Sequence, residues 1–347
     1  MKKILIVHTG GTIGSIPERQ CRDVKVAKAK KILFENFAAS ASPYAALADS
    51  LFEDVPPEFE TLSENMTVGI WNALLAHLAR FDLSAYSGVI LLHGTDTLAY
   101  TAALLALTQS ASPVPIMLVS GNKPPVCADG NANANFAAAV SLILQGIAPN
   151  VYVPYRNADG KTYLHLGATL LQCPDFSEDF RNADTAKCFL LNEKNEIDEA
   201  DFALCARFSS RRSSAVCRFP ALQEDTVLAV FPYVGLRYDR VSLDGVQGVL
   251  HATYHSGTLC VKDGAHSFLT LAERAGKHGI PVFLAPCYYG DDKYSSTAEA
   301  VEQGGAVPLA LTAEAAYVKL IMAISAGMRD DALVKFMKTD LVGEVIS

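Results

Sequence analysis

The stretch Ile4-Leu5-Ile6-Val7-His8-Thr9-Gly10-Gly11-Thr12-Ile13-Gly14 decides the fold that the sequence predicts. It begins with a short apolar run and ends in a turn that contains two adjacent glycines. Strands of a parallel sheet are buried on both faces, so they appear in a sequence as short runs of Val, Ile and Leu. Comparable runs occupy residues 89–92, 116–119 and 151–153. We therefore predict a series of buried parallel strands.

Segments with helical periodicity separate these runs. Trp71, Leu74, Leu75 and Leu78 share one helical face, and residues 98–107 and 135–144 also have a helical pattern. Alternation of strands and helices is typical of an α/β fold with a doubly wound, mainly parallel sheet.

The pattern is interrupted by a polar, basic segment at residues 207–218. After it the alternation resumes, with strands expected at 227–231, 246–250 and 281–284 and helices at 269–278 and 314–326. A chain of 347 residues also exceeds the usual size of one hydrophobic core. We predict a larger N-terminal domain (1–206), a connecting segment (207–225) and a smaller C-terminal α/β domain (226–347).

Composition excludes several classes of protein. The chain is 50% hydrophobic, has a formal net charge of −8 and contains no dense block of Lys and Arg, so we expect no nucleic-acid or membrane partner. The apolar run before His8 is too short for a signal peptide, and no run is long enough to cross a bilayer. None of the eight cysteines forms a C-x-x-C pair. Scattered cysteines of this kind are expected to be buried thiols, which fits a cytoplasmic protein.

The glycine turn after the first run is the first candidate site. Ligands bind beyond the carboxyl ends of strands in an open α/β sheet, and adjacent glycines allow the backbone to approach a ligand closely. Thr12 would present its hydroxyl there. A phosphate-binding loop is disfavoured because residues 10–14 match neither G-x-G-x-x-G nor the Walker pattern. A plain turn at the end of a strand remains an alternative.

The second candidate is His93-Gly94-Thr95-Asp96-Thr97, which also follows an apolar run. Thr95 or Asp96 could simply cap the following helix. The functional alternative is a hydroxyl and a carboxylate at the end of a strand, where the carboxylate can hold a substrate ammonium group.

Taken together, the two threonine motifs resemble the signature pair of the asparaginase/glutaminase family, and the chain looks like a bacterial-type L-asparaginase of the cytosolic kind. Residues 62–66 with Trp71 resemble the substrate-binding turn of this family, and residues 119–133 resemble its third conserved block. Residues 244–245, 253–257 and 294–296 resemble its smaller domain. The resemblance covers most of the chain.

This resemblance implies a two-domain amidohydrolase that converts L-asparagine to L-aspartate and ammonia, with L-glutamine as an alternative substrate. Members assemble as homodimers or homotetramers in which a neighbouring subunit closes each site. They use no metal and no organic cofactor.

The resemblance also assigns roles to residues. Thr12 is the nucleophile that forms an acyl-enzyme, and Thr95 belongs to the second hydroxyl of the site. Asp96 binds the α-ammonium group of the substrate and Ser63 its α-carboxylate. Glu64 lies where the family has Gln or Glu, again near the ammonium group.

Backbone N–H groups at Gly11 would stabilise the developing oxyanion. Two positions depart from the family pattern. The family commonly activates its nucleophile with a Tyr on the following loop, but residues 15–43 contain no Tyr and the first is Tyr44. The family Lys that activates the second hydroxyl is matched by His165, whereas Lys161 lies four residues earlier. We predict that His165 is the base, because its ordinary pKa is close to neutral.

Three other functions compete with an asparaginase. A catalytically weakened amino-acid-binding protein would explain the missing Tyr and Lys. An ammonia-delivering amidase subunit is the second, although such members usually carry an N-terminal extension and Met1 here directly precedes the first strand. A nucleotide-binding α/β protein is the third. We also note that His251, Tyr254, His255 and Tyr294 cluster near strand ends of the second domain and could contribute to a neighbour's site.

Overall fold

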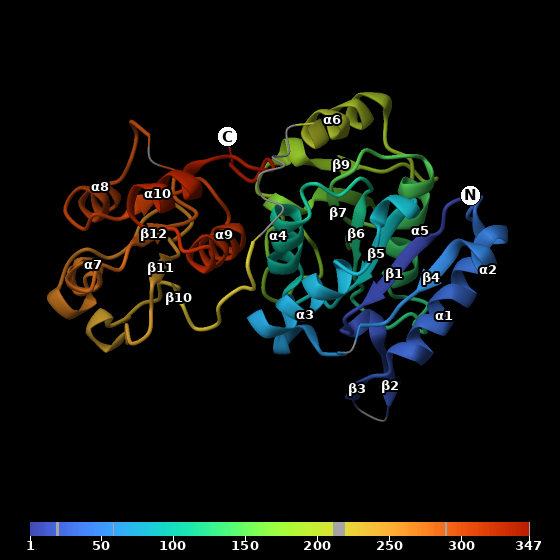
Figure 1. Cartoon of the computed structure of the whole chain (residues 1–347), viewed down its shortest axis with the longest axis horizontal. Coiled ribbons are helices and arrows are strands. Elements are labelled where there is room, and N and C mark those ends of the chain that lie inside the picture. Colours follow the sequence, from blue (N-terminus) through green and yellow to red (C-terminus); the bar gives the residue numbers. More distant parts are fainter. Residues whose placement is uncertain (19–20, 58, 211–218, 289, 347) are drawn as a thin grey trace. The chain divides into compact units, whose positions relative to one another are not determined.

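The computed structural model describes the chain except for residues 19–20, 58, 211–218, 289 and 347. It divides into two compact units (Figure 1). The first contains Met1–Arg218 and Leu341–Gly343, and the second contains Phe219–Asp340 and Glu344–Ser347. The predicted connecting segment 207–225 begins within helix α6 (Glu199–Ser210), and its residues 211–218 lie outside the described ones.

The N-terminal unit is built on a seven-stranded sheet with the order β4-β1-β5-β6-β7-β8-β9. The first five strands in this order are parallel, and β8 and β9 are antiparallel to their neighbours. The predicted doubly wound, mainly parallel sheet is therefore confirmed. The strands are β1 (Ile4–His8), β4 (Phe52–Asp54), β5 (Gly88–Leu92), β6 (Ile116–Val119), β7 (Val151–Arg156), β8 (Thr162–Leu166) and β9 (Cys188–Leu190).

Helices cover both faces of this sheet (Figure 1). Ile6, Leu92 and Val119 face a core that includes Phe136 of α5 and Leu33 of α1. Helix α4 packs on the opposite face, next to β7 and the segment that follows β8. The remaining elements of the unit include a short antiparallel hairpin after β1. These elements are β2 (Ser15–Glu18), β3 (Cys21–Val24), α1 (Val26–Ala38), α2 (Ala48–Leu51), α3 (Val68–Leu78), α4 (Leu98–Thr108) and α5 (Ala132–Leu144).

The C-terminal unit has a four-stranded parallel sheet with the order β10-β11-β12-β13. Val249 and Leu284 pack against α7 and α8, whereas Leu250 and Phe283 pack against α9 and α10. The predicted smaller α/β domain is thus confirmed. Its elements are β10 (Val227–Val230), β11 (Gly248–His251), α7 (Phe268–Lys277), β12 (Val282–Leu284), α8 (Ser295–Glu302), β13 (Val307–Pro308), α9 (Ala313–Ser325) and α10 (Asp330–Lys338).

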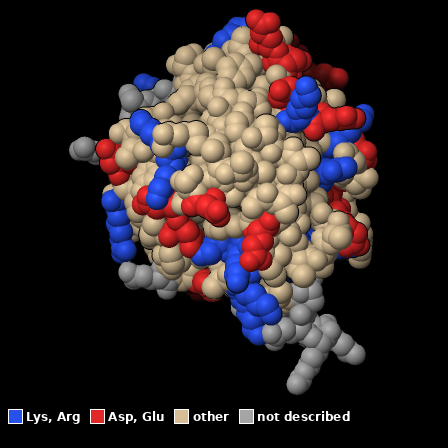
Figure 2. Space-filling view, turned by 90° about the vertical axis from the view of Figure 1, so that its right-hand side faces the viewer, with Lys and Arg blue, Asp and Glu red and all other residues tan. Residues whose placement is uncertain are grey.

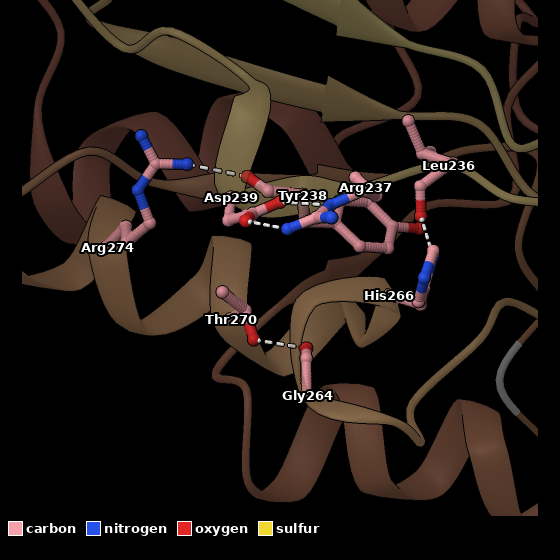
Figure 3. A network of polar contacts seen from close by, with 8 residues as sticks. All are labelled: Leu236, Arg237, Tyr238, Asp239, Gly264, His266, Thr270 and Arg274. Atoms are coloured by element: carbon pink, nitrogen blue, oxygen red, sulfur yellow. Dashed lines mark hydrogen bonds and ion pairs between the residues drawn. The ribbon is translucent and has the colours of Figure 1, made fainter.

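Polar contacts fasten the loop after β10 to α7 and to the segment before it (Figure 3). Arg274 of α7 donates to the carbonyl of Tyr238 at 2.6 Å, and Nδ1 of His266 lies 2.9 Å from the carbonyl of Leu236. Arg237 and Asp239 form an ion pair within the loop. These bonds give an irregular segment a fixed shape.

Charge is mixed on one face of the molecule. Figure 2 shows Lys and Arg side chains interspersed with Asp and Glu around a broad uncharged area on the face that it draws. Within the described chain, no helix is both long enough and apolar enough to span a membrane.

The prediction that the cysteines are buried holds only in part. Cys205 and Cys287 are buried, whereas Cys260 is exposed. Cys260 lies in the loop between β11 and α7, where the chain runs over the surface of the C-terminal unit.

Candidate active site

Three chain segments meet at the carboxyl ends of β1 and β5. The backbone of Gly10 forms a bridge with Thr61, and Gly11 N donates to the carbonyl of Thr61 at 3.0 Å. On the other side, Thr9 N donates to the carbonyl of Leu92 at 3.0 Å. The glycine turn is therefore held between the 61–65 segment and the end of β5.

Two glycines allow these segments to touch. Gly11 has a φ of +74°, and a Cβ there would lie 2.3 Å from Cα of Gly94. A Cβ at Gly94 would lie 2.4 Å from Oγ of Ser63. Heavy atoms do not approach this closely, so only glycine fits at either position. The contact brings the turn that carries Thr12 next to the loop that carries Thr95 and Asp96.

Thr12 begins a short 3-10 helix, Thr12–Gly14, and its side chain is half-buried. The carbonyl of Gly11 accepts hydrogen bonds from Gly14 N at 3.0 Å and from Oγ of Ser15 at 2.7 Å. These bonds fix the peptide that precedes Thr12. The residue is thus presented at the sheet edge on a constrained turn.

Asp96 is held by Ser63 rather than used as a helix cap. Oγ of Ser63 donates to Oδ2 of Asp96 at 2.8 Å and accepts from Asp96 N at 3.2 Å. Oγ1 of Thr97 donates to the carbonyl of Ser63 at 2.8 Å. Thr97 is the N-cap residue of α4, and its side chain makes no capping bond. The capping alternative for Thr95 and Asp96 is therefore wrong.

A buried chain of hydrogen bonds supports this loop from the α4 side. Nε1 of Trp71 donates to Oγ1 of Thr101 at 3.2 Å, and Oγ1 of Thr101 lies 3.0 Å from Nε2 of His93. Nδ1 of His93 lies 2.7 Å from the carbonyl of Gly94. Burial lowers the pKa of His93 to about 4, although the Gly94 bond and the charge of Asp96 oppose this shift. His93 is therefore neutral near pH 7, with Nδ1 as donor and Nε2 as acceptor.

A cavity of about 390 Å³ adjoins the loop on its other side. Nε2 of Gln172 donates to the carbonyl of Asp96 at its edge. Burial raises the pKa of Tyr155 to about 12 and also raises that of the Cys173 thiol, so both side chains are neutral near pH 7. The lining consists of Thr95, Asp96, Asn122, Tyr155, Gln172, Cys173, Pro174, Asp175, Phe176, Ser177 and Glu178.

His165 does not reach this cavity. It lies on β8 with 1% of its surface exposed, and neither ring nitrogen has a hydrogen-bond partner among the described residues. Leu164 and Leu166 face the core under α5, so the alternation of a strand directs His165 to the α4 face. Burial lowers its pKa to about 4. Its predicted role as a base stays a prediction, and its position argues against that role.

The side chain of Glu64 is exposed, whereas its neighbour Ser63 is buried. Of the predicted site residues, Thr95 and Asp96 line the cavity, and Gly11, Thr12, Ser63, Glu64 and His165 do not. Sequence reasoning missed Gln172 and Glu178, because the segment 171–179 is irregular and no periodic pattern marks it. Among the described residues, no three His, Cys, Asp or Glu side chains come together as they would around a metal ion.

The cluster predicted in the second domain is only partly at the surface. His251 is buried, with Nε2 at 2.8 Å from the hydroxyl of Tyr238 and Nδ1 close to the carbonyl of Ala252. It is therefore unable to contact a neighbouring molecule. Tyr254 and Tyr294 are exposed.

Comparisons with known proteins show what this chain is similar to. Residues 3–169 match the family model described as Asparaginase, N-terminal. The chain is 26% identical over 355 residues to a glutamyl-tRNA(Gln) amidotransferase subunit of Metallosphaera sedula, which covers 99% of this chain and 76% of that protein. The corresponding protein of Methanobrevibacter smithii is 26% identical over 351 residues, with 99% and 77% covered.

Solved structures show the same fold. The thermostable L-asparaginase from Thermococcus kodakarensis superimposes with a TM-score of 0.75 at 20% identity, covering 99% of each chain. L-asparaginase I from Vibrio cholerae O1 biovar eltor gives a TM-score of 0.73 at 20% identity, covering 100% of this chain and 99% of that one. The chain therefore has the same fold as these two L-asparaginases, and its residues 3–169 match the family model.

Proposed function

We propose that this protein hydrolyses the side-chain amide of L-asparagine to L-aspartate and ammonia, with Thr12 as the nucleophile. The observation that carries the proposal is the meeting of the Thr12 turn, the Thr95–Asp96 loop and Ser63 at the carboxyl edge of β1 and β5. This edge is where open α/β sheets bind ligands.

The reaction has two steps. The hydroxyl oxygen of Thr12 attacks the amide carbon, the carbon–nitrogen bond breaks, and the nitrogen takes a proton and leaves as ammonia. Thr95 lies on the adjacent loop, where its hydroxyl can pass that proton to the nitrogen. Water then attacks the ester on Thr12, which releases aspartate and restores the hydroxyl.

Recognition of the amino acid requires a partner for its α-ammonium group and a partner for its α-carboxylate. Asp96 is the partner for the α-ammonium group, and Ser63 is the proposed donor for the α-carboxylate, which requires its single hydroxyl proton to turn from Asp96 to the substrate. Because Ser63 is bonded to Asp96, the two groups are preorganised with respect to each other. Backbone N–H groups at the Gly11 turn are the proposed donors to the oxyanion. Glu64 keeps its predicted role near the ammonium group as a proposal, whereas the burial of His165 away from the cavity argues against its predicted role as a base.

A second candidate function is that of an ammonia-delivering component of a larger amidase. It is favoured by the two relatives named above, which are both amidotransferase subunits and which this chain matches over 99% of its length. Such a component would use the same Thr12 chemistry but would co-purify with a partner protein. The main proposal expects a homodimer or homotetramer instead, which light scattering of the purified protein distinguishes.

The decisive experiment measures ammonia release from L-asparagine and L-glutamine by the wild type and by Thr12→Ala. We expect release from L-asparagine that is lost in Thr12→Ala and partly kept in Thr12→Ser. Thr108→Ala, at the end of α4 opposite to the Thr95–Asp96 loop, is the matched control. Saturable asparagine binding without ammonia release would instead support the amino-acid-binding alternative.

A further inference from the structure

Three buried side chains form a hydrogen-bond network on the α4 side of the loop that follows β5. They are Trp71 on α3, Thr101 on α4 and His93 directly after β5. Nε1 of Trp71 and Nε2 of His93 both lie next to Oγ1 of Thr101, at 3.2 and 3.0 Å. Nδ1 of His93 lies 2.7 Å from the carbonyl oxygen of Gly94. The network therefore ends on the peptide that joins Gly94 to Thr95.

The two ends of the network fix the direction of every bond in it. The indole N–H of Trp71 can only donate, so Oγ1 of Thr101 accepts from it. The carbonyl of Gly94 can only accept, so Nδ1 of His93 carries a proton. Nε2 of the neutral ring is then an acceptor, and the single hydroxyl proton of Thr101 is donated to it. The other tautomer of His93 would place the lone pair of Nδ1 against the carbonyl of Gly94, so the network admits only one.

This network holds one side of Thr95, and a different bond holds the other side. His93 fixes the carbonyl of Gly94, which belongs to the peptide that precedes Thr95. After Thr95, the N–H of Asp96 donates to Oγ of Ser63 at 3.2 Å. Thr95 itself lines the cavity of about 390 Å³. Its backbone is thus fixed through both neighbouring residues, and with it the point from which its hydroxyl reaches the cavity.

The polar character of the network points to a need for direction. The buried residues of α4 are all Leu or Ala apart from Thr101. Apolar packing would join this helix to the sheet as well, but the hydrophobic effect has no preferred direction. A hydrogen bond weakens steeply when its angle departs from linearity, so a buried and fully paired network holds its last acceptor in one orientation. Here that acceptor is the carbonyl of Gly94.

We propose that Trp71, Thr101 and His93 are positioning residues of the reaction, which act through the Gly94 carbonyl to hold Thr95 in place. None of the three lines the cavity. The inference rests on the proposed function, because it concerns the hydroxyl that passes the proton to the leaving nitrogen. Breaking the network should therefore lower kcat and leave KM for L-asparagine nearly unchanged.

Substitutions of Thr101 test the proposal at the centre of the network. Thr101→Val has nearly the same shape but can neither accept from Trp71 nor donate to His93, whereas Thr101→Ser keeps the hydroxyl. With L-asparagine as substrate, Thr101→Val should lower kcat by about tenfold, the effect of one hydrogen bond, with KM within about twofold of the wild type. Thr101→Ser should restore most of kcat. Thr108→Val, which removes another hydroxyl from α4, should change neither constant.

A spectroscopic signal reports the network independently of turnover. Trp71 is the only tryptophan of the sequence, so its indole N–H gives a single side-chain signal of this kind in a proton–nitrogen correlation spectrum. This signal should move upfield in Thr101→Val, where the bond is lost, and stay in place in Thr101→Ser. In the same samples, near-ultraviolet circular dichroism measures the folded fraction to which kcat is referred.

Trp71→Phe provides a second variant, which serves also if Thr101→Val does not fold. It removes the first donor and keeps an aromatic ring, and kcat should fall by about threefold. Because Trp71 acts only through Thr101, the double variant should lose no more of kcat than Thr101→Val alone. Losses that multiply in the double variant would contradict a common network, and an unchanged kcat in Trp71→Phe would remove Trp71 from it.

The remaining outcomes separate this inference from the proposed function. A wild-type kcat in Thr101→Val, with the indole signal displaced, would overturn the inference and leave the proposed function standing. A loss of kcat that Thr101→Ser does not restore would also overturn it, because the shape of the side chain and not its hydroxyl would then be responsible. Absence of ammonia release by the wild type would overturn the proposed function, and the inference with it.

Discussion

Ser63 and Asp96 are joined by two hydrogen bonds through one hydroxyl, which donates to the Asp96 carboxylate at 2.8 Å and accepts from the Asp96 backbone at 3.2 Å. The two residues are 33 positions apart and come from different segments of the N-terminal unit. The hydroxyl is buried, whereas the carboxylate is exposed. Ser63 therefore sets the direction of a carboxylate that is open to a ligand.

Substitution Ser63→Ala should raise KM for L-asparagine by about tenfold, because the variant loses a charged hydrogen bond that orients Asp96 and a proposed donor to the substrate carboxylate. Steady-state kinetics measure this change. Ser50→Ala, on the surface helix α2, is the control and should leave KM as in the wild type. An unaltered KM in Ser63→Ala would remove Ser63 from the substrate site.

Substitution Gly11→Ala should reduce the free energy of unfolding by at least about 2 kcal/mol and abolish turnover, because its Cβ would collide with the backbone of Gly94. Gly146→Ala is the matched control. Gly146 has a similar φ of +78° but open space around it. Gly146→Ala should therefore lose only the cost of placing alanine in a left-handed backbone conformation, about 1 kcal/mol of unfolding free energy. Urea denaturation of both variants separates the cost of the collision from the cost of the left-handed backbone. Similar losses of unfolding free energy in the two variants would mean that the Gly11 loop moves freely away from Gly94.

Buried histidines should make the protein sensitive to acid. Burial lowers the pKa of His93, His165 and His251 to about 4, whereas the unfolded chain has the ordinary value near 6.5. The unfolded state binds more protons between these values, so the stability is complete above about pH 6.5 and falls as the pH drops toward 4. The pKa shift of one such histidine corresponds to about 3 kcal/mol of unfolding free energy. Urea midpoints measured across this range test the slope.

Substitution of His165 distinguishes a structural role of this residue from a catalytic one. His165→Leu should make the stability less dependent on pH between 6.5 and 4 and should retain turnover, because the ring has no described partner and lies away from the cavity. A loss of turnover of about a hundredfold or more, with the fold intact, would show instead that His165 acts as the predicted base.

Removal of one partner of the buried ion pair in the C-terminal unit should strongly reduce the free energy of unfolding. Lys319 and Glu344 are both completely buried and bonded to each other. Lys319→Met removes the cationic partner of a buried carboxylate and should cost roughly 3–5 kcal/mol of unfolding free energy, and the double variant with Glu344→Leu should recover most of it. Lys277→Met, which breaks an exposed pair, should change little. Equal stability of the single and double variants would contradict this interpretation.

The sequence by itself determined the strands and the two threonine motifs, because both depend on local patterns. An apolar run such as Ile4–Val7 has few alternatives to a buried strand, and a pair of glycines after it forms a tight turn. The positions of Thr12 and Asp96 at strand ends follow from these patterns.

Only the tertiary structure decided which side chains share the cavity. His165 was placed near the site because it matches the family Lys, but the alternation of β8 directs it into the interior. Gln172 and Glu178 gave no signal, since their segment has no periodicity and is fixed by bonds to Asp96 and Asn122, residues 76 and 56 positions away. Contacts of such long range depend on the order and register of the strands, which no local pattern of residues specifies.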